Sequence, residues 1–131
     1  MLVVRSVYTH GWVAERLVEL LRRDSTRVLK PIIFYTRSSA SEVVALSASL
    51  GEERLELNAG RPDFAKQLMR FDREDYALRP GSDVGVFMCG PDTVASSLRT
   101  GAQHAMLTSF MNAPANGEDQ MTSFFFTKEH F

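Results

Sequence analysis

One short apolar run constrains the fold of this chain more than any other stretch of the sequence. Residues 84–88 read VGVFM, and turn residues bound the run on both sides, Pro80 and Gly81 before it and Gly90 and Pro91 after it. A continuous apolar run of this length between turns is typical of a strand that is buried on both faces. Strands of that kind occur in parallel sheets covered by helices, so the run predicts an α/β fold.

Strand-like runs and helical periodicity alternate along the rest of the chain. Residues 2–8, 31–36, 54–58 and 123–127 are rich in apolar or alternating residues, which predicts four further strands. Three helices are predicted between them, and the serine-rich residues 38–49 indicate a loop or a short irregular helix. The expected inward positions are Val13, Leu17, Leu20 and Leu21 in the first helix, which Thr9 can cap; Phe64, Leu68 and Phe71 in the second; and Val94, Leu98, Ala102, Ala105 and Met106 in the third, which begins near Asp92 and ends near Phe110.

Alternation of strands and helices also predicts where a ligand would bind. It favours a parallel sheet with helices on both faces, and such sheets bind their ligands at the carboxyl ends of the strands. Four stretches are therefore candidates for a site: those that follow Tyr8, Thr36 and Met88, and the tail after Thr127.

The composition excludes several classes of protein. A length of 131 residues suggests one domain, and a formal net charge of −1 gives no global field that would attract nucleic acid or an anionic lipid surface. The three histidines lie far apart and lack the spacing of metal ligands, and no apolar stretch approaches the ~20 residues of a membrane span. The single cysteine, Cys89, cannot form an internal disulfide and suggests a reducing compartment.

Cys89 is expected at the carboxyl end of the apolar strand, where a ligand could reach it. Gly90 has no Cβ and lets a ligand approach the backbone closely, and Pro91 suits the first turn of the helix that follows. A thiol at this point is compact and polarisable and can lie against a flat ring. The competing interpretation is a small core residue, which is the more common role of a cysteine at the end of a buried strand.

Three motifs resemble the C-terminus of the ferric reductase and NADPH oxidase family. They are NAGRPDF, VGVFMCGPD and the closing FFFTKEHF, in the order and spacing of that family. The stretch VYTHGWVAERLVELL also resembles the second strand and helix of the family's nucleotide-binding lobe. The resemblance implies a Rossmann-like three-layer sandwich with a mostly parallel sheet, and it implies that residues 1–131 form part of an NAD(P)-binding domain.

The resemblance also assigns roles to individual residues. Cys89, Gly90 and Pro91 would lie beside the nicotinamide and its ribose. Arg61 would reach the adenosine end of the cofactor, because its planar guanidinium can bind phosphate bidentately and stack on adenine; a solvated turn residue is the alternative. Phe131 would cover the flavin of the partner lobe, which makes Cys89 and Phe131 the catalytic candidates; a frayed terminus is the alternative for Phe131.

The adenosine phosphates have further candidates after the first two strands. Thr36 and Arg37 end the second strand and offer a cluster that suits a phosphate, although an exposed loop would explain them as well. Tyr8 follows the first strand, near where the family often carries a phosphate-binding arginine, and Arg5 is expected inside that strand. Both NADP(H) and NAD(H) therefore remain open as the cofactor.

One part of the family's lobe has no counterpart in this sequence. In the family, a strand and a glycine-rich turn open the lobe and hold the pyrophosphate at a helix N-terminus. The eight glycines here form no G-x-G-x-x-G. That strand is central in the family's sheet, so we interpret the chain as a fragment and expect unpaired strand edges with possible self-association.

As a function, the resemblance implies the NAD(P)H-binding portion of a transmembrane oxidoreductase, at the cytosolic face of a membrane. Hydride would pass to FAD, and electrons through haem to ferric iron or dioxygen; FAD and haem would be bound by the flavin-binding and membrane domains of the same protein. The isolated chain would then be inactive. A non-catalytic reductase-like interaction module is the alternative.

Two other functions are disfavoured. A redox-sensing thiol is disfavoured because no Lys, Arg or His flanks Cys89. Nucleic-acid binding is disfavoured because basic and aromatic residues are not interleaved along the chain.

Overall fold

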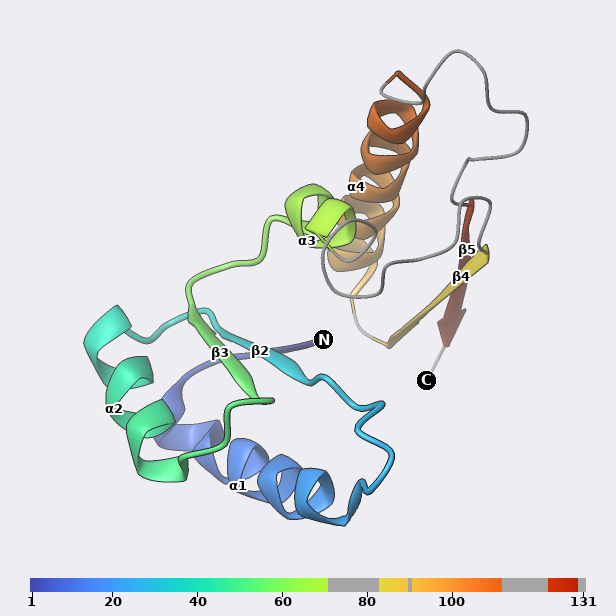
Figure 1. Ribbon diagram of the computed structural model, residues 1–131. Helices are drawn as coiled ribbons and strands as arrows, with labels where there is room; N and C mark the ends of the chain where they lie inside the picture. The colour runs from blue at the N-terminus through green and yellow to red at the C-terminus, as the bar shows by residue number, and fades with distance from the viewer. Residues whose placement is uncertain (71–82, 90, 112–122, 130–131) are drawn as a thin grey trace. The chain divides into compact units, whose positions relative to one another are not determined.

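The computed structural model describes residues 1–70, 83–89, 91–111 and 123–129. The chain divides into two compact units, Met1–Pro62 and Asp63–Phe131 (Figure 1). Both units combine parallel strands with helices, so the prediction of an α/β fold with parallel strands is confirmed. None of the described helices is long and apolar enough to span a membrane.

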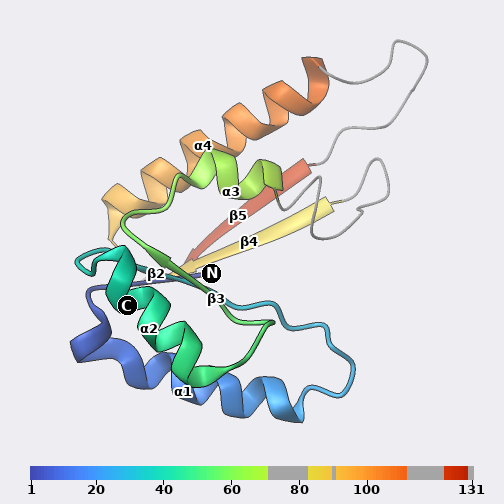
Figure 2. The same cartoon turned by 60° about the vertical axis from the view of Figure 1, so that its left-hand side comes forward.

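The first unit is a parallel sheet of three strands with two crossover helices. The strands β1 (Leu2–Val4), β2 (Ile32–Tyr35) and β3 (Glu56–Ala59) lie in that order, joined by α1 (Val7–Arg23) and α2 (Ala40–Leu50). Both crossovers step across the sheet in the same direction, and right-handed connections then place both helices on one face. Figure 1 and Figure 2 show α1 and α2 together on that face.

The core of the first unit lies between this face and the two helices. Ile33 and Tyr35 alternate toward the helices along β2, and neither side chain has any exposed surface. Burial of an aliphatic or aromatic side chain of this size stabilises a fold by about 1.5–3 kcal/mol. The buried members of this cluster are Ala14, Val18, Leu21, Ile33, Tyr35, Val43 and Leu55.

Arg54 ties the C-terminal end of α1 to the turn before β3. Its guanidinium lies 3.3 Å from a carboxylate oxygen of Asp24 and 3.3 Å from one of Glu52, and it donates to the carbonyl oxygen of Leu21 in the last turn of α1. A cation at this position satisfies carbonyl groups that have no partner within the helix and complements the helix dipole. The network holds the amino end of β3 beside the end of α1.

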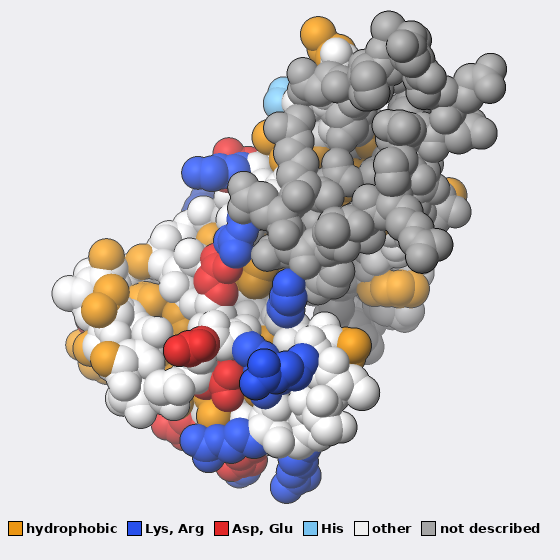
Figure 3. Space-filling model, viewed as in Figure 1, with side chains coloured by type: hydrophobic (Ala, Val, Ile, Leu, Met, Phe, Trp, Pro, Cys, Tyr) orange, Lys and Arg blue, Asp and Glu red, His pale blue; other side chains and the backbone are white. Residues whose placement is uncertain are grey.

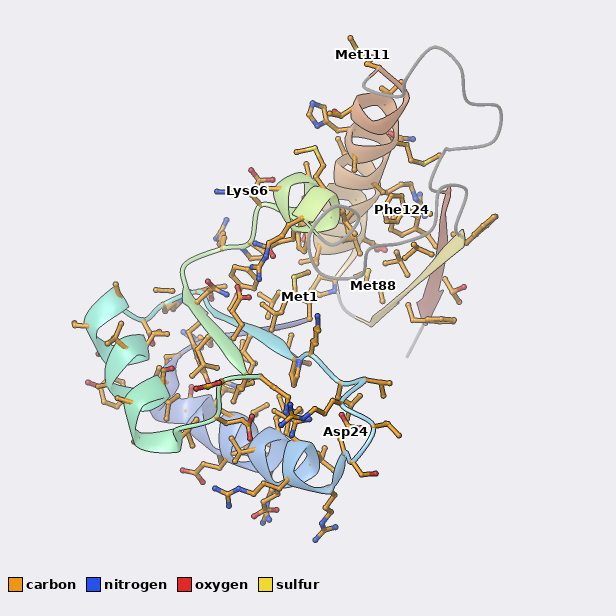
Figure 4. All side chains as sticks on the ribbon, viewed as in Figure 1. Met1, Asp24, Lys66, Met88, Met111 and Phe124 are labelled. Atoms are coloured by element: carbon orange, nitrogen blue, oxygen red, sulfur yellow. The ribbon has the colours of Figure 1, made fainter. Side chains whose placement is uncertain are left out.

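The second unit pairs two parallel strands under two helices. Its elements are α3 (Phe64–Arg70), β4 (Asp83–Cys89), α4 (Asp92–Met111) and β5 (Ser123–Glu129), with β4 paired along its length to β5. Figure 2 shows α3 and α4 on the same side of the two strands. Phe124, labelled in Figure 4, points from β5 toward α4. The buried cluster on this side is Ala102, Ala105 and Phe124, with Leu68, Met69, Val84, Val86, Met106 and Phe126 packed around it.

The prediction that residues 84–88 are buried on both faces is wrong. Val84 and Val86 face the helices, but Phe87 is 79% exposed on the opposite face of β4, and Phe125 beside it on β5 is 59% exposed. The reason is that α3 and α4 cover one face of this sheet, and no described element of this unit covers the other.

The first strand and helix also differ from the sequence-based expectation. The strand was expected over residues 2–8, but β1 ends at Val4, and Ser6 rather than Thr9 caps α1. Ser6 is extended (φ −152°, ψ 159°) and its hydroxyl accepts from the Thr9 backbone, which satisfies one free donor of the first turn. Leu20, expected in the core, is 50% exposed, because the buried face of α1 is formed by Ala14, Val18 and Leu21.

Residues 40–50, left open between a loop and an irregular helix, form a regular helix. Ser39 and Glu42 make a reciprocal capping box at its start, and Gly51 ends it in the left-handed conformation (φ 60°) that favours glycine. Of the other predicted core positions, Phe71 lies outside the described residues.

Close packing of α3 on α4 depends on a glycine. A Cβ added at Gly101 would lie 2.8 Å from the Ala65 backbone nitrogen and 3.0 Å from the Phe64 Cβ. Such contacts require α3 to move, because backbone atoms cannot rotate away. Gly11 in α1 is the matched contrast, since its nearest neighbour would be the Val7 side chain at 4.0 Å.

We expect Gly101→Ala to lower the free energy of unfolding by about 1–3 kcal/mol, despite the better helix propensity of alanine. Gly11→Ala should raise it by about 0.5–1 kcal/mol, because alanine adds propensity where there is room. Urea denaturation of the two variants beside the wild type measures both changes. A Gly101→Ala protein as stable as Gly11→Ala would contradict the packing described here.

Candidate functional site

The carboxyl ends of β1, β2 and β3 meet at one edge of the first unit. The Thr36 backbone N–H and hydroxyl both donate to the carbonyl oxygen of Val4, at 3.0 and 3.1 Å. The Gly60 N–H donates to the carbonyl oxygen of Tyr35 at 2.9 Å. These bonds continue the pairing beyond the strands, so the residues that follow each strand are held side by side. Ligands of parallel α/β sheets bind at this edge.

An arginine follows each of the three strands at this edge. Arg5 comes directly after β1, Arg37 follows β2, and Arg61 comes after Gly60, whose φ of 90° favours glycine and turns the chain out of β3. The Arg37 N–H donates to the Arg5 carbonyl oxygen at 2.7 Å, which makes these two backbones neighbours. All three side chains are exposed, and within the described residues none has an ion pair. Exposed guanidinium groups of this kind can bind phosphate bidentately.

The N-terminus of α1 is already capped by side chains of this chain. The Ser6 hydroxyl accepts from the Thr9 N–H at 3.4 Å, and the Val7 N–H donates to the Ser38 hydroxyl at 2.9 Å. The second bond crosses from α1 to the residues after β2 and fixes the two segments together. An anion that binds here therefore meets fewer free N–H groups than an uncapped helix would offer.

A carboxylate from the chain occupies the N-terminus of α2. The Ser39 N–H donates to a Glu42 carboxylate oxygen at 2.7 Å, and the Glu42 N–H donates to the Ser39 hydroxyl at 3.3 Å. The Ser39 backbone bond, and next the Tyr8 hydroxyl, hold the pKa of Glu42 below its usual value, and interaction with the Glu42 carboxylate raises the pKa of Tyr8. The carboxylate stands where an external anion would otherwise bind.

The structure corrects the expected positions of Arg5 and Tyr8 and shows what the Thr36 hydroxyl binds. Arg5 was expected inside a strand, which is wrong: it follows β1 and belongs to the edge. Tyr8 is not at the end of a strand but in the first turn of α1, and it is 83% exposed. Thr36 uses its hydroxyl on the Val4 carbonyl, so its donor is committed to the backbone. The signal for Arg5 was present in the sequence, since Ser6 is a good N-cap three residues before Thr9.

The candidates of the second unit lie around the start of α4. Cys89 is the last residue of β4 and is paired with Glu129. The Pro91 carbonyl accepts from the N–H groups of Val94 and Ala95, at 3.0 and 3.1 Å, which makes Pro91 the N-cap residue of α4. Strand, turn and helix thus follow one another as the sequence predicted.

Two candidates, Gly90 and Phe131, lie outside the described residues. The cofactor roles of Cys89, Gly90, Pro91 and Phe131 remain predictions. Within the described part of the chain, no group of three or more His, Cys, Asp or Glu side chains is arranged to hold a metal ion.

Surface charge on the viewed face is mixed. Figure 3 shows basic and acidic side chains interspersed over the first unit, without a large region of one sign. Attraction of a ligand to the edge therefore depends on individual arginines rather than on a basic surface.

Parallel strands joined by helices, with arginines at their carboxyl edge, define a Rossmann-like α/β domain. A sequence model of one family, described as ferric reductase NAD binding domain, matches residues 1–103, from β1 into α4. The chain belongs to this family of NAD(P)H-binding oxidoreductase domains, so the family resemblance of its motifs is confirmed. No curated protein and no solved structure matches the chain.

Acid should weaken the first unit partly through Glu42. Its folded-state pKa lies below the ordinary value of 4.5, so its hydrogen bonds stabilise the fold above that value and are lost as the pH falls through the folded-state pKa. Glutamine at this position keeps a capping box but cannot titrate. The free energy of unfolding of Glu42→Gln should therefore fall less than that of the wild type as the pH is lowered.

Urea denaturation between about pH 3 and pH 7 measures this effect. Glu53→Gln is the matched control, because Glu53 is exposed and lies outside the helices, and it should keep the wild-type pH profile. A Glu42→Gln profile that follows the wild type over the whole range would contradict the assignment.

Proposed function

We propose that this chain binds the adenosine half of NADPH or NADH through the edge of its first unit. The observation that carries the proposal is the set of three exposed arginines, Arg5, Arg37 and Arg61, one after each parallel strand. The phosphates of a dinucleotide are the anions that such guanidinium groups suit best in this family. Because both helix N-termini are capped from within, the arginines carry most of the phosphate binding.

The same residues favour NADPH over NADH. The 2′-phosphate of NADPH is an exposed anion that needs a cation. Arg5 can supply this cation because it lies at the edge, after β1, and not inside the strand as the sequence alone predicted. The ribose of NADH, which carries a hydroxyl there, gains less from a guanidinium.

On the nicotinamide side, we propose that Cys89, Gly90 and Pro91 line the ring and its ribose, with Phe131 covering the flavin when the cofactor is away. The end of β4 and the start of α4 directly after Pro91 support this arrangement. When bound, the nicotinamide would supply a hydride for the FAD of a neighbouring domain, with haem and then ferric iron or dioxygen as the acceptors beyond it. The residues of this chain orient the ring and exclude water.

FAD and haem belong, in this proposal, to the flavin-binding and membrane domains of the same protein, with this chain at the cytosolic face. A second candidate is an interaction module that has lost its cofactor. One observation favours it: the N-termini of α1 and α2 are both occupied by side chains, and the sequence offers no G-x-G-x-x-G turn in their place.

Titration with NADPH and NADH by calorimetry separates the two candidates. We expect NADPH to bind more tightly, and Arg5→Ala or Arg37→Ala to weaken NADPH binding by about 10-fold or more, because each removes a charged hydrogen-bond donor. NADH binding should fall by less wherever the lost contact is with the 2′-phosphate. Arg16→Ala is the control, since Arg16 is exposed on α1 and paired with Glu19. A wild-type chain that binds neither dinucleotide would favour the interaction module.

We also propose that free strand edges let the chain self-associate. β1 pairs with β2 and has no second partner among the described strands. The Val4 carbonyl points to β2, so by alternation the backbone groups of Val3 face the open edge, and the Val3 side chain is 42% exposed. An apolar open edge invites pairing with another chain.

Light scattering during size-exclusion chromatography should therefore give a mass above that of a monomer, rising with concentration. Val3→Lys should shift the chain toward the monomer, because a charge on an edge strand opposes pairing. Val44→Lys adds the same charge on α2, where the side chain is 66% exposed, and should leave the mass unchanged. A monomer at every concentration would contradict the proposal.

A further inference from the structure

The loop between α1 and β2, residues 24–31, exposes two neighbouring apolar side chains. Val28 is 67% exposed and Leu29 is 48% exposed. The loop leads into the amino end of β2, and the strands of this sheet are parallel. It therefore lies at the edge of the first unit opposite the carboxyl edge, and it takes no part in the candidate cofactor site.

Hydrogen bonds to one carboxylate hold this loop in its conformation. The Asp24 carboxylate accepts from the Leu29 N–H at 3.0 Å and from the Thr26 hydroxyl at 2.8 Å, and the Arg54 guanidinium lies 3.3 Å from it. Figure 4 shows Asp24 at the end of α1, where the loop begins. Arg27 has a φ of 55°, a left-handed conformation that costs free energy for a residue other than glycine. The chain thus holds an apolar pair at its surface in a fixed loop, in spite of this strain.

The charge that surrounds the apolar pair is mainly basic. Four cationic side chains are exposed between residues 22 and 30: Arg22, Arg23, Arg27 and Lys30. The one acid of that stretch, Asp24, has only 6% of its side chain exposed because it faces the loop backbone and Arg54. The neighbouring turn adds an exposed acid, Glu53, so the cations outnumber the acids that reach solvent here.

An exposed apolar pair between basic side chains matches the chemistry of an anionic bilayer surface. Apolar side chains enter the boundary between headgroups and acyl chains, and each Lys or Arg beside them adds attraction to anionic headgroups. An acidic protein surface would pair with the cations, but it would also need an apolar pocket to cover Val28 and Leu29. Because the net charge of the chain is −1, attraction acts only when the loop is close to the surface.

We propose that residues 24–31 form a contact loop for an anionic phospholipid bilayer, with Val28 and Leu29 inserted at the level of the headgroups and the basic side chains on the headgroup phosphates. The contact is weak and reversible, because two apolar side chains bury far less surface than a membrane helix does. The inference deepens one part of the proposed function, the position of the chain at a membrane, and rests on none of its cofactor contacts.

The test is flotation of the full chain with vesicles, beside calorimetric titration with NADPH. Vesicles of equal parts phosphatidylcholine and phosphatidylserine are compared with vesicles of phosphatidylcholine alone. Flotation separates chain bound to vesicles from self-associated chain, which does not rise. We expect binding to the anionic vesicles only, and loss of most of it between about 0.05 and 0.5 M salt, because salt screens the attraction to the headgroups.

Two loop variants remove the two halves of the contact. Val28→Ser/Leu29→Ser should weaken binding to the anionic vesicles about 10-fold or more, because it removes the inserted apolar surface. Arg23→Gln/Arg27→Gln should weaken it by about 5-fold for each cation removed. Both variants should keep the wild-type affinity for NADPH, and nuclear magnetic resonance spectra report whether each is folded.

Two control variants carry the same kinds of substitution elsewhere. Val44→Ser/Leu107→Ser is the apolar control, because these side chains are 66% and 62% exposed on α2 and α4, and it should float as the wild type does. Arg37→Gln/Arg61→Gln is the control for charge at the other edge of the sheet. It should bind NADPH more weakly and keep its binding to vesicles.

Four results would overturn the inference: no flotation of the wild type with anionic vesicles, equal flotation with both kinds of vesicle, loop variants that float as the wild type does, or an equal loss in the apolar control. Polyglutamate is the probe for an acidic protein. A wild type that binds polyglutamate through this loop but binds no vesicle would assign the loop to such a partner and overturn the inference as well. Loss of vesicle binding in the loop variants of a chain that binds no dinucleotide would support the inference and contradict only the cofactor proposal.

Discussion

Pairing of β2 with a strand on each side is the constraint on which the first unit depends. Ile33 and Tyr35 are fully buried because β1 and β3 flank them and two helices cover the same face. The hydrogen bonds continue past the strand ends, where the Arg37 N–H donates to the Arg5 carbonyl oxygen. The sheet thus positions the residues of the candidate site by extending its own backbone pairing one residue further.

The charged side chains at this edge are of two kinds: a carboxylate that is bound within the chain, and arginines that are exposed to solvent. Glu42 has a partner in the chain, since its carboxylate accepts from the Ser39 N–H in the capping box of α2. The arginines are available, because they are exposed and have no ion pair within the described part of the chain. The phosphates of a ligand would therefore be bound by arginine side chains. Many Rossmann-like domains instead bind them with free N–H groups at a helix N-terminus.

Local sequence signals predicted most elements, and tertiary context explains where they failed. The apolar run of β4 and the turn at Pro91 predicted a strand followed by a helix, and the structure has both. The serine-rich stretch was left open because serine disfavours helix interiors, yet Ser39 and Glu42 form a capping box that starts α2. Phe87 is exposed because burial depends on what covers a face, and hydrophobicity along a strand carries no information about that.

By itself, the sequence determined the class of fold, the family and the identity of the residues that end each strand. Alternation of apolar runs with helical periodicity is a local pattern, and the motifs around Arg61 and Cys89 are contiguous, so neither requires contacts between distant segments. Only the tertiary structure decided that Arg5 joins Arg37 at one edge and that the Val7 N–H meets the Ser38 hydroxyl. These neighbours are more than 30 positions apart in the chain, and parallel pairing through a crossover helix is what brings them together.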